Sequence, residues 1–195
     1  WGSLIKDLPF YDVIVLAGEY IGSSDLWPDR STFEKLIAKT YELGIGIVFM
    51  NSYFEYRYMK EYPYGINLLY YYYKNPRSIG SSYDQGNVFY QVVKSHPILE
   101  GYSIGERIYI IEGGDYDFAW FSNWDGDLLA YIGSEDVGIV GGGIGVKITK
   151  ANTRWVLLAG LSPQTWTNMD HWTDEAKEIL YRSVVWASVK PVNIS

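Results

Sequence analysis

Apolar and polar positions in the first 50 residues follow the periods of a strand, a helix and a second strand. Residues 11–18 form a continuous apolar run that ends at a glycine, which is typical of a strand buried on both faces. The pattern Ser-x-x-Glu at 31–34 predicts a capping box, and the apolar stripe behind it predicts a helix that ends before Gly44. Residues 45–50 predict another buried strand. This order indicates a βαβ unit with parallel strands and a right-handed crossover.

Shorter apolar segments fill the rest of the chain. A short helix is predicted at 53–62, followed by an irregular, tyrosine-rich segment at 63–84. A closing helix is predicted at 174–187, with Thr173 as its N-cap. Further strands are predicted at 107–111, 118–122, 128–132 and 137–140, and a hairpin at 144–149 and 154–160 that turns at 150–153.

Composition narrows the class of protein. A chain of 195 residues favours a single domain over 1–195, and a net charge of −7 argues against a nucleic-acid partner. The absence of cysteine excludes thiolate catalysis and disulfides, and no apolar run is long enough to insert into a membrane. The 19 tyrosines and eight tryptophans are either a surface layer over an ordinary core or a binding face.

The ends of the sequence suggest a piece of a larger polypeptide. The chain begins at Trp1 without an initiator methionine, so we expect a processed or excised product. A glycosylation sequon at 193–195 favours an extracellular or cell-surface location, with the cytoplasm as the alternative.

Several stretches together resemble the class I glutamine amidotransferase-like superfamily, in particular its ThuA-like branch. They are 10–16, the capped helix, 44–49, the His-Pro-Ile segment at 95–101, 106–109, 160–166, and the helix end at 185–187. The resemblance implies an α/β fold with a flavodoxin-like three-layer sandwich. Its central sheet would be mostly parallel, with helices on both faces and an added antiparallel hairpin region.

The sequence departs from that family at the residues that carry its chemistry. The family has a nucleophilic cysteine, or in ThuA-like proteins often a histidine, where this chain has Asn51 and Ser52. A second ThuA-like histidine corresponds to Ser162. Asparagine cannot act as the thiolate nucleophile, and Ser52 would need a base within hydrogen-bond reach. Of the two histidines, His96 matches a structural position of the family, whereas His171 is predicted to lie near the carboxyl end of the sheet.

The start of the chain is also unusual for this fold. A strand and a helix normally precede the strand at 11–18, and that missing strand is central in the sheet. Either an upstream segment supplies it, or the strand order differs. A gap in the middle of the sheet would leave buried backbone groups unpaired.

Open α/β sheets bind ligands at the carboxyl ends of their strands. Such a pocket would take a neutral, hydrogen-bonding ligand such as a sugar, because tryptophan and tyrosine rings stack well against sugar rings. The alternative is a cluster of loops without a ligand. The candidate ligand-binding residues are Glu19, Tyr20, Asn51, Ser52, Ser162, Gln164 and Trp166.

Two other motifs have weaker chemical interpretations. Asp115, Asp117, Asp125 and Asp127 could supply oxygens to Ca²⁺, but their spacing is not that of an EF-hand, and they could equally form turns. The glycine-rich stretch 141–145 precedes a predicted strand and no helix, so we expect a tight β connection and no phosphate site.

Two functions remain open. The first is a non-catalytic module of a larger extracellular or cell-surface protein, whose partner is the rest of its polypeptide, another protein chain or a carbohydrate. The second is a hydrolase acting on a carbohydrate or an amide, with Ser52, Glu19 and His171 as its candidate catalytic residues. No cofactor is expected in either case, apart from the possible Ca²⁺.

Overall fold

The computed structural model describes residues 2–17, 20–21, 30–51, 53–54, 86–113, 118, 120–121, 126–161 and 169–190. Its helices are α1 (Gly2–Asp7), η1 (Leu8–Phe10), α2 (Arg30–Leu43), η4 (Pro97–Leu99), η5 (Met169–His171) and α4 (Asp174–Ala187). Its strands are β1 (Val13–Ala17), β2 (Tyr20–Ile21), β3 (Gly46–Asn51), β4 (Tyr53–Phe54), β5 (Val88–Val92), β6 (Arg107–Ile111), β7 (Asp127–Ser134), β8 (Gly138–Ile148) and β9 (Arg154–Ala159).

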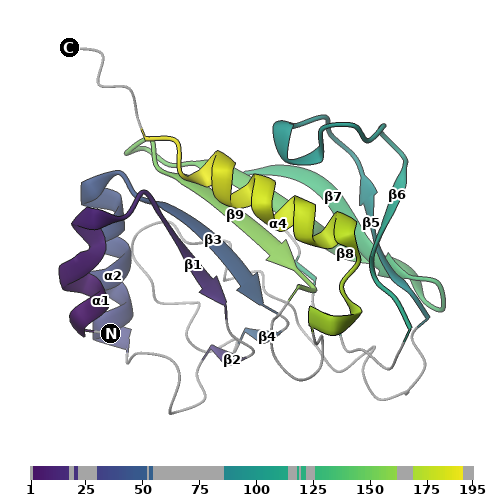
Figure 1. Ribbon diagram of the computed structural model, residues 1–195, viewed down its shortest axis with the longest axis horizontal. Coiled ribbons are helices and arrows are strands. Elements are labelled where there is room, and N and C mark those ends of the chain that lie inside the picture. The colour runs from purple at the N-terminus through teal and green to yellow at the C-terminus, as the bar shows by residue number, and fades with distance from the viewer. Residues whose placement is uncertain are drawn as a thin grey trace.

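Seven strands form one mixed sheet in the order β1-β3-β9-β8-β7-β5-β6 (Figure 1). Only the pairs β1–β3 and β3–β9 are parallel, and the other four pairs are antiparallel. The fold is therefore α/β, but the prediction of a mostly parallel sheet is wrong. The reason is that β5, β6, β7 and β8 pair antiparallel, and that the short β7–β8 and β8–β9 connections need no crossover helix.

The parallel part of the sheet has helices on both faces. On β3 and β9 successive side chains alternate between two core clusters, as the pleat of a strand requires. Phe49 and Leu157 join the cluster that contains Leu36 and Ile37 of α2, whereas their neighbours on the other face join the cluster beneath α4. Helices therefore lie on both faces around β1, β3 and β9, whereas over the antiparallel strands the described helix that packs is α4, on one face. The flavodoxin-like three-layer sandwich stays a prediction.

The apolar run at 11–18 predicts a strand that is buried on both faces. In the structure, β1 is an edge strand instead. Ile14 and Leu16 are buried, while Val15 on the opposite face is 42% exposed. Strand β1 also pairs directly with β3, so the sheet has no gap between them.

Helix α2 begins earlier than its sequence predicts. It starts at Arg30, which places Ser31 inside the first turn and not at the N-cap of a capping box. At the other end, Gly44 has a φ of 71°, as expected for the residue that terminates a helix in the left-handed conformation. The helix predicted at 53–62 is wrong in its first two residues, which form β4 parallel to β2; the rest of that segment lies outside the described residues.

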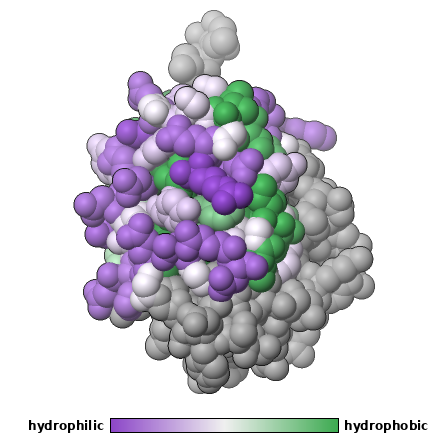
Figure 2. All heavy atoms as spheres, turned by 90° about the vertical axis from the view of Figure 1, so that its right-hand side faces the viewer, coloured by the Kyte–Doolittle hydropathy of each residue, from purple (hydrophilic) through white to green (hydrophobic). Residues whose placement is uncertain are grey.

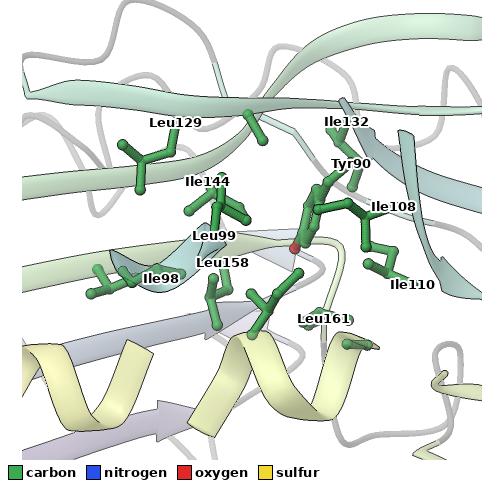
Figure 3. Close-up of a cluster of buried hydrophobic side chains, with 14 of the residues drawn as sticks. Tyr90, Ile98, Leu99, Ile108, Ile110, Leu129, Ile132, Ile144, Leu158 and Leu161 are labelled. Carbon is green, nitrogen blue, oxygen red and sulfur yellow. The ribbon is translucent and has the colours of Figure 1, made fainter. Parts of the chain in front are cut away.

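The antiparallel strands curl around the core beneath α4. The hydroxyl of Tyr90 on β5 donates a hydrogen bond of 2.5 Å to the carbonyl oxygen of Ala159 on β9. In the sheet order these strands are three spacings apart, about 14 Å across a flat sheet, which is more than a tyrosine side chain can bridge. The hydrogen bond therefore requires strong curvature, and the apolar side chains of β5, β6, β7 and β8 converge inside the curve (Figure 3).

The glycine-rich stretch is not a turn. It lies within β8, a single strand that replaces the two strands predicted at 137–140 and 144–149. A Cβ added at Gly141 would collide with the ring of Trp120, and one added at Gly142 with the ring of Phe121. At Gly143 an added Cβ would lie 2.7 Å from the ring of Tyr90. These glycines make room for aromatic rings on both faces of β8.

The last part of the chain folds as predicted. Strands β8 and β9 form an antiparallel hairpin, in whose turn Asn152 has a φ of 59°. Helix α4 has the predicted bounds, and the Thr173 hydroxyl accepts a hydrogen bond of 3.1 Å from the Ala176 backbone N–H. The same hydroxyl donates to the Tyr109 carbonyl oxygen, which ties the start of α4 to the end of β6.

Candidate functional site

The carboxyl ends of β1, β3 and β9 lie next to one another at one end of the sheet, as a ligand site of this fold requires (Figure 1). Asn51 is the last residue of β3 and pairs with Ala159 of β9. Beyond the ends of β1 and β3 the chain continues into β2 and β4, where Tyr20 pairs with Tyr53 in parallel. The backbones that carry the predicted pocket are therefore neighbours at this end.

Most side chains of the predicted pocket cannot be placed. Glu19, Ser52, Ser162, Gln164 and Trp166 lie outside the described residues, and of Asn51 and Tyr20 only the backbone is described. The structure thus brings the carboxyl ends of β1, β3 and β9 together.

His171 is an exposed residue of η5 at the same end of the sheet. Its carbonyl oxygen accepts a hydrogen bond of 3.1 Å from the backbone N–H of Glu112, next to β6. The following residue, Trp172, bridges to Ile111 and belongs to the same core cluster as Met50 of β3. The imidazole is therefore carried by the last part of the connection between β9 and α4, and this part is anchored at β6.

Tyr90 is a residue of this end that the sequence pattern did not identify. Its ring lies in the core, and its hydroxyl holds the last carbonyl of β9, directly before the loop that carries Ser162 (Figure 3). Burial raises the pKa of this hydroxyl far above its usual range, so it stays a hydrogen-bond donor. The sequence predicts no strand at 88–92, and Tyr90 is one of the tyrosines that it assigns to a surface layer or to a binding face.

The proposed calcium ligands are not brought together among the described residues. Asp127 is at the start of β7 and forms an ion pair of 2.7 Å with Lys94. The other three, Asp115, Asp117 and Asp125, lie outside the described residues. Within the described ranges, no group of three or more His, Asp or Glu side chains is arranged to hold a metal ion.

His96 has a structural role, as its position in the sequence predicts. Its Nδ1 accepts a hydrogen bond of 3.3 Å from the Ile98 backbone N–H at the start of η4, and its ring lies edge-on to Trp186 at 5.0 Å between centroids. Burial is the main cause that lowers the pKa of His96; Lys94 and Arg154 lower it further, against the opposing effect of Asp127.

A pH-dependent loss of stability follows from this environment. Because the pKa of His96 is lower in the folded protein than the value of 6.5 of a free histidine, folding favours the neutral ring. The free energy of unfolding is therefore expected to fall as the pH drops below about 6.5, since the unfolded chain then binds the proton more readily. Urea unfolding between pH 7.5 and 5 would measure this dependence.

The matched control for this measurement is His96→Asn, which keeps a side-chain acceptor for the N-cap and cannot titrate in this range. The acid-induced loss of unfolding free energy in the wild type should exceed that of the variant. Parallel pH profiles of the two proteins would show that His96 does not sense pH.

Comparison with known proteins identifies no relatives, since no protein-family model and no curated protein matches the chain. Among its described helices, none is both long and apolar enough to cross a lipid bilayer.

Proposed function

We propose that the chain is a non-catalytic module of a larger extracellular or cell-surface protein, built on a glutamine amidotransferase-like, flavodoxin-like scaffold, and that it serves in assembly with another protein chain. The observation that carries this proposal is an exposed apolar surface at the end of the sheet where the parallel strands begin. We call it the amino-end surface; its apolar members are Phe10, Tyr11, Ile148 and Val189.

These four residues lie at the same end of the sheet, where β1 and β9 begin and where β8 and α4 end. Phe10 and Tyr11 directly precede β1, and Ile148 ends β8 opposite Arg154, the first residue of β9. Val189 follows α4, and its neighbour Lys190 forms an ion pair of 2.7 Å with Asp12. Strands β1 and β8 are three spacings apart in the sheet, so the surface is about 14 Å wide.

The exposure of these side chains is large for their type. Phe10 is 84% exposed and Ile148 is 58% exposed. Single exposed apolar residues are ordinary, but several of them gathered at one place are typical of a surface that binds another protein. The β6 side of the molecule differs, since hydrophilic side chains make up most of its described surface (Figure 2).

Cross-linking tests the proposal because Lys150 and Lys190 flank the amino-end surface and Lys177 lies on the first turns of α4, at the other end of the helix. In the native protein we expect lysine-specific cross-links to another chain through Lys150 or Lys190, detected by mass spectrometry. The variant Phe10→Ser/Ile148→Ser should lose them. Tyr181→Ser, a substitution of a 64% exposed residue elsewhere on α4, should keep them. Cross-links only through Lys177 would contradict the proposal.

The second candidate is a hydrolase, favoured by the exposed imidazole of His171 at the carboxyl end of the sheet. In that case turnover of chromogenic glycosides or amides should be measurable, and Ser52→Ala or Glu19→Gln should abolish it without unfolding the protein. In an assembly module the same two substitutions are silent.

A further inference from the structure

The two ends of the sheet carry opposite charge. At the end where the parallel strands finish, the exposed charged residues of the described segments are Lys177 and six acids: Glu112, Glu135, Asp136, Asp170, Asp174 and Glu175. We call this the carboxyl-end surface. It extends over the end of β6, the turn between β7 and β8, η5 and the start of α4.

The amino-end surface has the opposite sign. Lys147, Lys150, Arg154 and Lys190 lie at this end, and the exposed acids close to Phe10 and Tyr11 are Asp7 and Asp12. The adjacent pair Lys94 and Asp127 neutralises itself in an ion pair. An acidic protein thus carries a locally basic, apolar surface at one end and its acidic surface at the other.

We propose that the occupant of the amino-end surface is the carboxyl-end surface of a second copy of this chain, so that copies associate head to tail. This inference rests on the proposed function and names its partner. Charge complementarity is the reason, because the basic surface of one copy faces the acidic surface of the next. A two-fold arrangement would join like ends and lacks this complementarity.

Apolar side chains support the same contact at both ends. Val137 and Ile139 are exposed at the β7–β8 turn, beside Glu135 and Asp136, and Met169 is exposed beside Asp170. Each surface therefore offers apolar contact area within a set of charges, as specific protein interfaces do. A head-to-tail contact leaves one surface free at each end of a pair, so the copies form rows that grow with concentration.

Charge reversal at each end tests the proposal. Lys150→Glu/Lys190→Glu removes the basic excess of the amino-end surface, and Glu112→Lys/Asp136→Lys removes most of the acidic excess of the carboxyl-end surface. All four side chains are exposed, so the fold should persist, and circular dichroism would verify it. Sedimentation velocity of the full chain at low salt should show concentration-dependent association of the wild type. Each double variant should weaken association at least about tenfold.

The decisive sample is an equimolar mixture of the two double variants, because each variant retains the wild-type surface that the other has lost. The mixture should associate again, but only into pairs, and 0.5 M salt should weaken every association. A wild type that stays monomeric at low salt up to millimolar concentration would overturn the inference. The inference would also be overturned if only the amino-end variant lost association, because the contact would then join two amino-end surfaces.

These outcomes separate the inference from the proposed function. Cross-links through Lys150 and Lys190 to a different chain, combined with a monomeric wild type, would refute head-to-tail association and leave the assembly function standing. Enzymatic turnover that requires Ser52 or Glu19 would refute the assembly function itself.

Discussion

Replacing Gly46 by alanine is expected to lower the free energy of unfolding by about 3 kcal/mol, a loss at the upper end for overpacking in a core. Gly46 is the first residue of β3, and an added Cβ would overlap the carbonyl group of Ala187 in the last turn of α4. It would also lie 3.1 Å from the carbonyl oxygen of Arg154. Both obstacles are backbone atoms, so α4 would have to shift away from the sheet.

Thermal unfolding followed by circular dichroism would measure the effect, which corresponds to a decrease in Tm of roughly 6–12 °C for a chain of this size. The control is Gly2→Ala in α1, where an added Cβ meets no atom within 4 Å, and where a change within about 0.5 kcal/mol is expected. Equal Tm values for the two variants would show that α4 does not pack this closely on β3.

Tyr90→Phe is expected to cost about 2 kcal/mol, because it leaves the buried carbonyl oxygen of Ala159 without its hydrogen bond. The ring remains, so the core beneath α4 keeps its packing, and the loss reports the hydrogen bond between β5 and β9. A decrease in Tm of roughly 4–8 °C should result. Hydrogen exchange should also become faster at the end of β9, since this contact holds the strand to the curled side of the sheet.

Tyr109→Phe provides the control for this comparison. Its hydroxyl donates a hydrogen bond of 3.3 Å to the exposed carboxylate of Glu135, where water can replace it. A change within about 0.5 kcal/mol is expected. If both variants lose the same free energy of unfolding, the hydrogen bond from Tyr90 to Ala159 does not stabilise the curled sheet.

An element was predicted correctly from the sequence where the residues that specify it all lie within one segment of the chain. Helix α4 was predicted to the residue because its apolar stripe and its N-cap Thr173 are all within one segment. The β1–α2–β3 unit and the β8–β9 hairpin were also predicted correctly. Strand β5 was missed, although its Val88, Tyr90 and Val92 are buried, because it follows a long tyrosine-rich segment that carries no strand signal.

The predictions were wrong where one sequence pattern is compatible with two different structures. A run of glycines is typical of a turn, yet in β8 it makes room for Trp120, Phe121 and Tyr90, which come from other segments. The apolar run of β1 is typical of a central strand, yet β1 is at the edge, because the position of a strand in a sheet depends on its partners.

The predictions for the candidate site residues differ in their outcome. His96 was correctly assigned a structural role, whereas the proposed set of Glu19, Ser52 and His171 stays a prediction because two of its members lie outside the described residues. The resemblance to the glutamine amidotransferase-like superfamily, the single domain and the cell-surface location also stay predictions. The amino-end surface was not foreseen, because its four apolar residues are far apart in sequence.

By itself, the sequence determined the α/β class, the parallel β1–β3 pair, the hairpin and helix α4, since local periodicity, caps and turns suffice for these. Only the tertiary structure decided the order of the strands, the curl that brings Tyr90 to Ala159, and the gathering of charge and apolar area at opposite ends of the sheet. Each of these depends on contacts between residues distant in the chain, which no local pattern encodes.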